Sequence, residues 1–100
     1  KSFGGVLSTG QRYLVCNYPD VTSRRGCLAI AVSRPGERVI SMLRTIRQGT
    51  PPVQIPGLCK EPQWSYPYAV EAAGSLYVTY SISKEDCAMS VIPLDALAVR

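Results

Sequence analysis

The stretch that decides the fold is Trp64–Leu94, WSYPYAVEAAGSLYVTYSISKEDCAMSVIPL. Its apolar and polar residues alternate from one position to the next, and short turns such as Ala73-Gly74-Ser75 interrupt them, which is typical of an antiparallel meander. We predict strands at Tyr66–Ala72, Leu76–Ile82 and Cys87–Leu94. The alternation is clearest in the middle strand, where one face should carry Leu76, Val78, Tyr80 and Ile82. A three-stranded ribbon is marginal alone, so this meander should pack against another layer.

Further strands are predicted in the first half of the chain, at Phe3–Ser8, Arg12–Tyr18, Gly26–Ser33 and Val39–Arg47. Gly4-Gly5 in the first of them indicates a close approach of another part of the chain. The third, CLAIAVS, is apolar almost throughout, so both of its faces should be covered. Residues 48–63 are rich in proline and glycine and predict a long irregular connection. A loop of this length in a compact domain is commonly functional.

The predicted fold class is all-β, with antiparallel meanders in one domain spanning residues 1–100. Residues 1–47 should form a four-stranded unit, 48–63 the connection, and 64–100 an incomplete unit of three strands. Helix should be limited to one short turn in Asp95–Val99. Seven strands also suit a β-sandwich, so that architecture remains an alternative.

The composition is that of a folded domain with a mildly basic surface. Hydrophobic residues make up 46% of the 100 residues and charged residues 18%, against ~25% in average domains. The net charge is +4, but Arg24-Arg25 is the only adjacent basic pair, so the clustering of a nucleic-acid site is missing. No apolar run approaches the ~20 residues of a membrane helix. Neither nucleic acid nor membrane is therefore an expected partner.

The cysteine pattern and the absence of histidine restrict the chemistry. Cys16, Cys27, Cys59 and Cys87 form no CxxC pair and the chain has no His, so neither a metal site nor a cofactor is expected, and a Cys–His catalytic pair cannot form. Three of them lie in apolar strand patterns, where cysteine is usually a small buried hydrophobe: Cys16, Cys27 and Cys87. A Cys16–Cys27 disulfide is the alternative, and it would require an oxidising compartment.

Three segments resemble the C-terminal part of sialidase-like β-propellers with BNR or Asp-box repeats: GQRYLVCNYPD (10–20), RRGCLAIAVSRPGE (24–37) and the stretch 64–94. The resemblance covers most of the chain and is most specific in the last segment. The Asp-box turn, S-x-D-x-G-x-T-W, is degenerate here, since only Ser33 and Gly36 remain of it. Family members are six-bladed propellers of several hundred residues, so the resemblance implies that this chain supplies the last two blades, the second of them lacking one strand.

The resemblance also implies where a sugar would bind. Sialidases hold the substrate carboxylate with three arginines and attack with a tyrosine that a glutamate activates, with an aspartic acid as proton donor. Arg25 stands where the last of those arginines is found, with Arg24 equally available, and Trp64-Ser65 stands where the Tyr-Ser motif is found. Because tryptophan has no ionisable oxygen, Tyr66 is the alternative hydroxyl, and Trp64 becomes either a stacking platform for a sugar ring or a hydrophobic plug. The expected substrate-binding residues are therefore Arg25, Trp64 and Tyr66, each of which could instead be a solvated or core side chain.

Two hypotheses of function follow. The first is a C-terminal propeller segment, similar to sialidase-like glycoside hydrolases, that contributes to binding an acidic sugar. It would be catalytically incomplete alone, because the other arginines, the glutamate and the acid belong to earlier blades. The second is a small non-catalytic binding or assembly module. No residue of this chain is predicted to be catalytic.

Self-association is the remaining expectation. The strands Val39–Arg47 and Cys87–Leu94 would be open edges, and unprotected edges invite pairing. Their partly exposed apolar side chains would be Leu43, Ile46, Met89 and Val91. We expect either three chains completing a six-bladed ring or a dimer pairing edge to edge, unless the rest of a larger propeller supplies the partner surface.

Overall fold

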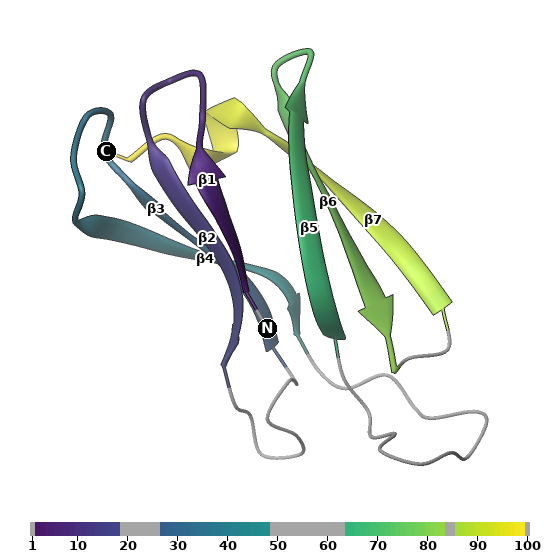
Figure 1. Cartoon of the computed structure of the whole chain (residues 1–100). Helices are drawn as coiled ribbons and strands as arrows, with labels where there is room; N and C mark the ends of the chain where they lie inside the picture. Colours follow the sequence, from purple (N-terminus) through teal and green to yellow (C-terminus); the bar gives the residue numbers. More distant parts are fainter. Residues whose placement is uncertain (1, 19–26, 49–63, 84–85, 100) are drawn as a thin grey trace.

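The computed structural model describes residues 2–18, 27–48, 64–83 and 86–99. These residues form two antiparallel sheets and one turn of 3₁₀ helix (Figure 1), which confirms the predicted all-β class. The elements are β1 (Phe3–Val6), β2 (Arg12–Tyr18), β3 (Cys27–Ser33), β4 (Ile40–Gln48), β5 (Trp64–Ala72), β6 (Ser75–Ile82), β7 (Asp86–Pro93) and the 3₁₀ helix η1 (Leu94–Leu97).

Both sheets are meanders in which each strand pairs with its neighbours in sequence. The first sheet has the order β1-β2-β3-β4 and the second the order β5-β6-β7. The largest differences from the predicted bounds are that β1 ends at Val6 and that β5 begins at Trp64. The first arises because the Gly10 N–H donates to the Leu7 carbonyl, at 2.9 Å, and turns the chain. The second arises because a bulge after Ser65 lets the β5–β6 ladder continue across Pro67.

The two-residue turn at Ala73 and Gly74 connects β5 directly to β6. Ala73 and Gly74 both have positive φ, 50° and 79°, between the paired residues Ala72 and Ser75. Two successive positive φ values define a type I′ turn, whose twist matches that of the flanking strands. The left-handed conformation suits Gly74 and is strained for Ala73.

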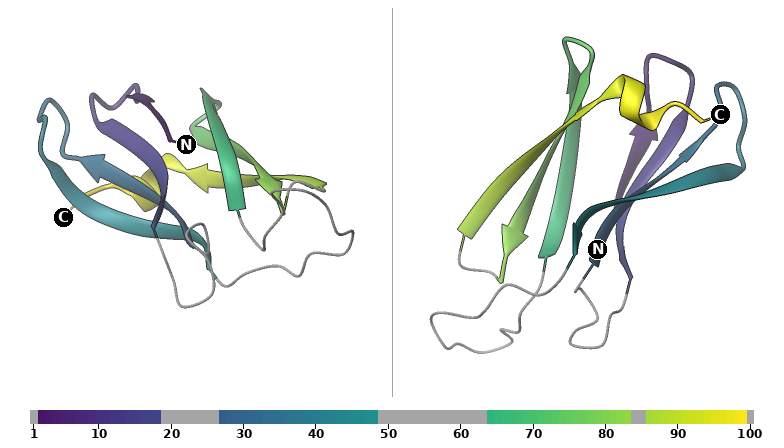
Figure 2. Two further views of the ribbon diagram at one scale, coloured as in Figure 1. Left: turned by 60° about the horizontal axis from the view of Figure 1, so that its bottom comes forward. Right: turned by 180° about the vertical axis from the view of Figure 1, so that it is seen from behind.

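The core lies between the two sheets, which stand as separate layers in both views of Figure 2. The alternation predicted for β6 is confirmed, since Leu76, Val78 and Tyr80 are buried. Every residue of β3 is buried, although the second sheet covers only its inner face, because its outward residue Ala31 is small and lies between Leu14 and Leu43 of the flanking strands. The core cluster consists of Leu7, Tyr13, Val15, Leu28, Ile30, Val32, Trp64, Ala69, Leu76, Val78, Tyr80 and Leu97.

Gly4 and Gly5 allow β1 to lie close against β2, as predicted. A Cβ atom at Gly5 would stand 3.0 Å from the Tyr13 hydroxyl oxygen, and one at Gly4 would stand 3.0 Å from the Tyr13 carbonyl oxygen. The Tyr13 ring therefore lies over bare backbone. Burial, and after it the charge of Glu71, raises the pKa of Tyr13.

Gln11 ties the C-terminal helix to the first sheet. Its side chain is 2% exposed, and its Nε2 donates to the carbonyl oxygens of Ser33, at 3.0 Å, and Leu97, at 2.7 Å. Its Oε1 accepts from the Thr9 hydroxyl at 2.8 Å. The Gln11 amide thus donates to two buried carbonyl groups.

Glu71 on β5 accepts a hydrogen bond from the β1–β2 turn, and this contact predicts a pH dependence. The Ser8 N–H donates to Glu71 Oε1 at 2.7 Å. Hydrogen bonds from the Ser8 hydroxyl, and next from its N–H, hold the pKa of Glu71 below its ordinary value of 4.5. Such a carboxylate stabilises the fold fully above its unfolded-state pKa and loses that contribution as the pH falls through its lower folded-state pKa.

We therefore expect the free energy of unfolding to fall as the solution is acidified below about pH 4.5, and to fall less in the variant Glu71→Gln. Urea titrations of both proteins across that range measure the difference. Glu37→Gln, on the exposed β3–β4 turn, is the matched control. The prediction is wrong if Glu71→Gln leaves the pH dependence as it is in the wild type.

The cysteines follow the prediction only in part. Cys27 is buried and Cys16 is half-buried, both with free thiols, so the alternative of a Cys16–Cys27 disulfide does not hold. Burial, and after it Cys27, raises the pKa of the Cys16 thiol. Cys87 is exposed, contrary to prediction, because it pairs with Ser81 on the outward side of the edge strand β7. Cys59 lies outside the described residues.

The two sheets are in contact on the side of β1 and β5 and are separated on the side of β4 and β7. The second sheet meets the first mainly through β5, which contacts β1, β2 and β3. Between β4 and β7 a cavity of about 260 Å³ opens, lined by residues that include Ile30, Arg44, Ser90 and Ile92. The pair of sheets is therefore a wedge, narrow at β1 and β5. None of the helices within the described ranges is long and apolar enough to span a membrane.

Candidate functional site

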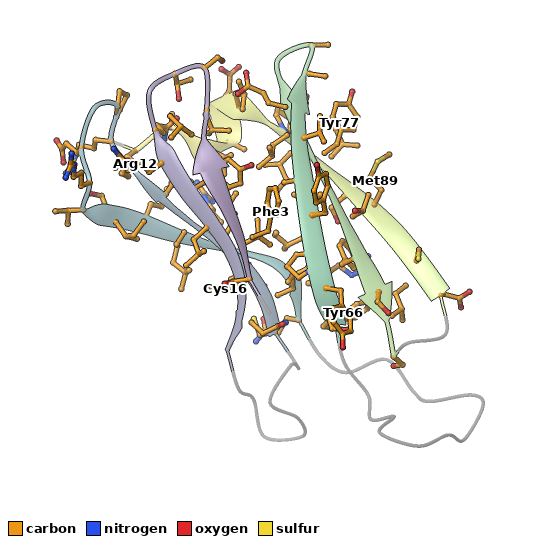
Figure 3. The ribbon with its side chains drawn as sticks, in the orientation of Figure 1. Phe3, Arg12, Cys16, Tyr66, Tyr77 and Met89 are labelled. Carbon is orange, nitrogen blue, oxygen red and sulfur yellow. The ribbon has the colours of Figure 1, made fainter. Side chains whose placement is uncertain are left out.

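Two of the three predicted site residues lie at the end of the molecule where β5 begins. Trp64 and Tyr66 both lie there, and Figure 3 shows Tyr66 at the lower end of the strand. Arg25, the third predicted residue, lies outside the described residues. The same end of the first sheet carries the last residues of β2 and β4, Tyr18 and Gln48, and the first residue of β3.

Trp64 is a core residue. It is 5% exposed and points into the space between the sheets. Its ring meets Tyr80 edge to face, with centroids 6.0 Å apart and an interplanar angle of 82°, and the guanidinium carbon of Arg47 lies 4.5 Å from the ring centroid. Both contacts are of stabilising types. This placement fits the hydrophobic plug that the sequence left open and does not fit an exposed platform for a sugar.

Asn17 holds the two sheets together beside Trp64. Its Nδ2 donates to the carbonyl oxygen of Cys27, at 3.1 Å, and to that of Trp64, at 2.7 Å. The first contact is within the first sheet and the second crosses to β5. Its Oδ1 is buried and has no hydrogen-bond partner among the described residues. A buried acceptor without a partner is costly, so this amide oxygen lowers the net stability gained from the two hydrogen bonds of the Asn17 side chain.

Ser65 and Tyr66 occupy a distorted segment of β5. The register of the β5–β6 ladder shifts between Ser65 and Tyr68, and Tyr66 adopts a φ of 53°. A non-glycine residue in the left-handed region costs about 1–3 kcal/mol, and such residues are enriched at functional sites as well as occurring in turns, as Ala73 does. Tyr66 is 48% exposed, whereas Ser65 is fully buried and its hydroxyl has no partner among the described residues.

The candidate site is therefore the end of β5 together with the residues that hold it: Asn17, Arg47, Trp64, Ser65 and Tyr66. It offers one exposed phenol, that of Tyr66, and the Arg47 guanidinium that lies over Trp64, whereas the Asn17 Oδ1 and Ser65 Oγ atoms are buried. Glu71 stands five positions along β5, roughly 16 Å from Tyr66 at ~3.3 Å per residue, and cannot activate it. Within the described ranges no group of three His, Cys, Asp or Glu side chains could hold a metal ion.

Asn17, Arg47 and Ser65 were not predicted from the sequence. Asn17 carried a signal, because it breaks the inward row that begins with Tyr13 and Val15, and a polar residue at a core position needs a partner. No comparable indication in the sequence placed Arg47 or Ser65 at this site. Arg47 reaches Trp64 only because a bulge in β4 places it opposite Leu28, on the inner face.

Comparison with known proteins gives no further guide, since no family model, no curated protein and no solved structure matches this chain.

Proposed function

We propose that this chain is the C-terminal, two-blade portion of a sialidase-like propeller and that it contributes to binding an acidic sugar at the end of β5, without being catalytically complete. The observation that carries the proposal is the strained Tyr66, which presents its side chain to solvent beside the buried Ser65 hydroxyl. Strain of this kind persists only where the surrounding structure holds it, and it is commonly part of a ligand site.

The two-blade interpretation is supported by the topology. Each sheet is a meander, as propeller blades are, and the first strands of the two meanders, β1 and β5, contact each other. The wedge shape is what adjacent blades need if their first strands are to line a common axis. In this arrangement Tyr66 stands near the axis, where propellers bind their ligands.

The test is titration calorimetry with N-acetylneuraminic acid, with N-acetylglucosamine as the neutral probe. We expect binding of the acidic sugar to weaken by about 1.5–3 kcal/mol in Arg25→Ala, the usual scale for a hydrogen bond to a charged group, and by about 0.5–1.5 kcal/mol in Tyr66→Phe, which loses only a hydroxyl. Arg34→Ala removes the same charge from the opposite end of the first sheet, where Arg34 Nη1 donates to the Ser41 hydroxyl, and is the matched control.

Three results would contradict the proposal. Equal loss in Arg34→Ala and Arg25→Ala would show that net charge alone drives binding. Unchanged affinity in Arg25→Ala and Tyr66→Phe would remove the assigned residues from the site. An absence of binding to either sugar by the wild type would reject the glycan function altogether.

The second candidate, a non-catalytic assembly module, is favoured by a different observation. Large apolar side chains are half-exposed on the outer faces of both sheets, among them Leu43, Met89 and Val91. Exposed apolar patches of this kind are uncommon on monomers unless they bind something.

A further inference from the structure

The cavity on the wide side of the wedge lies between β4 and β7 and has an apolar lining. Its volume is about 260 Å³, and η1 bounds it where the chain crosses from β7 toward the first sheet (Figure 2). Its floor is closed, since Ile30 and Leu97 are each 1% exposed. Its walls include Ile46 of β4 and Ile92 of β7, which are half-buried and pack against the core cluster. The cavity therefore offers apolar side chains that the two sheets do not cover.

A cationic side chain, that of Arg44, lines one wall of this cavity. Arg44 pairs with Ile30 of the core, and paired residues share a face of a sheet, so Arg44 belongs to the inner face of the first sheet. Its neighbours in that row, Met42 and Ile46, pack against the core. Arg44 forms no hydrogen bond and no ion pair with any of the described residues. Its guanidinium, which has five donors and no acceptor, is therefore available to an anion.

The opposite wall carries a hydroxyl group that can donate into the cavity. Ser90 pairs with the buried Val78, so it lies on the inner face of β7, and its Oγ lies 2.7 Å from the Tyr80 hydroxyl oxygen. Because Tyr80 is 2% exposed, its O–H proton needs an acceptor, and the Ser90 Oγ supplies one. With Tyr80 as the donor, the Ser90 proton is left for an acceptor in the cavity. Arg44 and Ser90 thus present donors from opposite walls.

We propose that this cavity binds a small aliphatic carboxylate, whose charged end is held by Arg44 and Ser90 and whose aliphatic group lies against the apolar walls. A carboxylate has only acceptors and meets the planar fork of an arginine with two parallel hydrogen bonds. A cavity of about 150 Å³ holds benzene, so one of about 260 Å³ has room for an aliphatic group of about six carbons. A few polar groups in a mainly apolar lining are the usual composition of a small-molecule site.

Asp95 restricts the charge that the ligand can carry. It lines an adjoining cavity of about 440 Å³ together with Arg44, with which it forms no ion pair. A second negative charge on the ligand would face this carboxylate, and like charges at close range repel each other. The site should therefore prefer a monocarboxylate to a dicarboxylate. It is built from β3, β4, β7 and η1, and the proposal is independent of sugar binding at the end of β5.

Titrations followed by nuclear magnetic resonance test the proposal, with the methyl groups of Ile30, Ile46 and Ile92 as reporters. The probes are hexanoate, the neutral hexanol and the dianion hexanedioate, all at neutral pH. We expect hexanoate to shift the three methyl signals and to bind about tenfold more tightly than hexanol, because a hydrogen bond to a charged group contributes about that factor. Hexanedioate should bind more weakly than hexanoate.

Three variants separate the charge from the apolar pocket. Arg44→Gln, at an exposed position, should weaken hexanoate binding about tenfold and leave hexanol binding unchanged. Arg38→Gln removes the same charge from an exposed residue that does not line the cavity, and is the matched control. Ala96→Leu adds carbon atoms at an exposed residue of η1 that lines the cavity, so it should weaken the binding of both probes. Circular dichroism and a cooperative melt establish that each variant is folded.

Each of the following outcomes would overturn the proposal. If hexanoate shifts none of the three methyl signals, the cavity is the seat of a protein side chain rather than of a small ligand. Unchanged affinity for hexanoate in Arg44→Gln would remove the guanidinium from the site, and equal losses in Arg44→Gln and Arg38→Gln would show that net charge alone drives binding. Unchanged affinity for both probes in Ala96→Leu would place the ligand outside the cavity.

Discussion

Replacing Trp64 by alanine should lower the free energy of unfolding by about 3–5 kcal/mol, the usual cost of truncating a large buried aromatic side chain. Trp64 is 5% exposed and fills the space between the sheets against Tyr80, with Arg47 over its ring. The cavity that alanine leaves would be bounded by strands from both sheets, so neither can collapse into it alone. Against a total stability of about 5–15 kcal/mol for ordinary domains, this loss leaves a marginal fold.

Urea denaturation followed by circular dichroism measures this loss without relying on the fluorescence of Trp64, which is the only tryptophan of the chain. Trp64→Phe should cost less than Trp64→Ala, because a phenyl ring fills part of the volume. Val39→Ala, at a position that is 70% exposed, should change stability by less than about 0.5 kcal/mol and serves as the control. A change below about 1 kcal/mol in Trp64→Ala would place the indole outside the core.

Replacing Gln11 by leucine should lower the free energy of unfolding by about 2–5 kcal/mol, although leucine is apolar and the site is buried. The amide donates to the carbonyl oxygens of Ser33 and Leu97, and leucine removes both hydrogen bonds in a place that is 2% exposed to solvent. Each buried carbonyl that loses its partner costs about 1–3 kcal/mol. The loss also frees η1, whose last residue Leu97 belongs to the core.

Gln48→Leu makes the same chemical change at an exposed position at the end of β4 and should be nearly neutral. Urea denaturation of the two variants gives the comparison, and hydrogen exchange of the η1 amides locates the effect. Equal stability of Gln11→Leu and Gln48→Leu would contradict the role given to the buried amide.

The strands were predictable from the sequence because each of them is a local pattern. The alternation in 76–82 indicates which side chains face the core, and the continuous apolar run in β3 indicates a central strand, in which every residue is buried. The start of β5 at Trp64 was not predictable, because the ladder resumes at Ser65 and Trp64 only across a bulge, and that bulge leaves no mark in the sequence.

The parts of the site that depend on distant residues were also beyond the sequence. Gln11 is buried because its amide meets Leu97, a residue near the other end of the chain. Asn17 is held by the carbonyl of Trp64, which belongs to the other sheet. Trp64 could be an exposed platform or a plug as far as local pattern goes, and only the packing of the two sheets decides between them.

The meander order of both sheets has a consequence for how the chain reaches its native state. Every strand pairs only with a strand that precedes or follows it in the chain, so each hairpin closes a short loop at little entropic cost, and hairpins form in about 1–10 µs. The contacts of Asn17 with Trp64 and of Gln11 with Leu97 join segments far apart in the chain, so they close long loops. Docking of one preformed sheet on the other is therefore the late event, and the bridging amides act on the rate of unfolding rather than on the rate of folding.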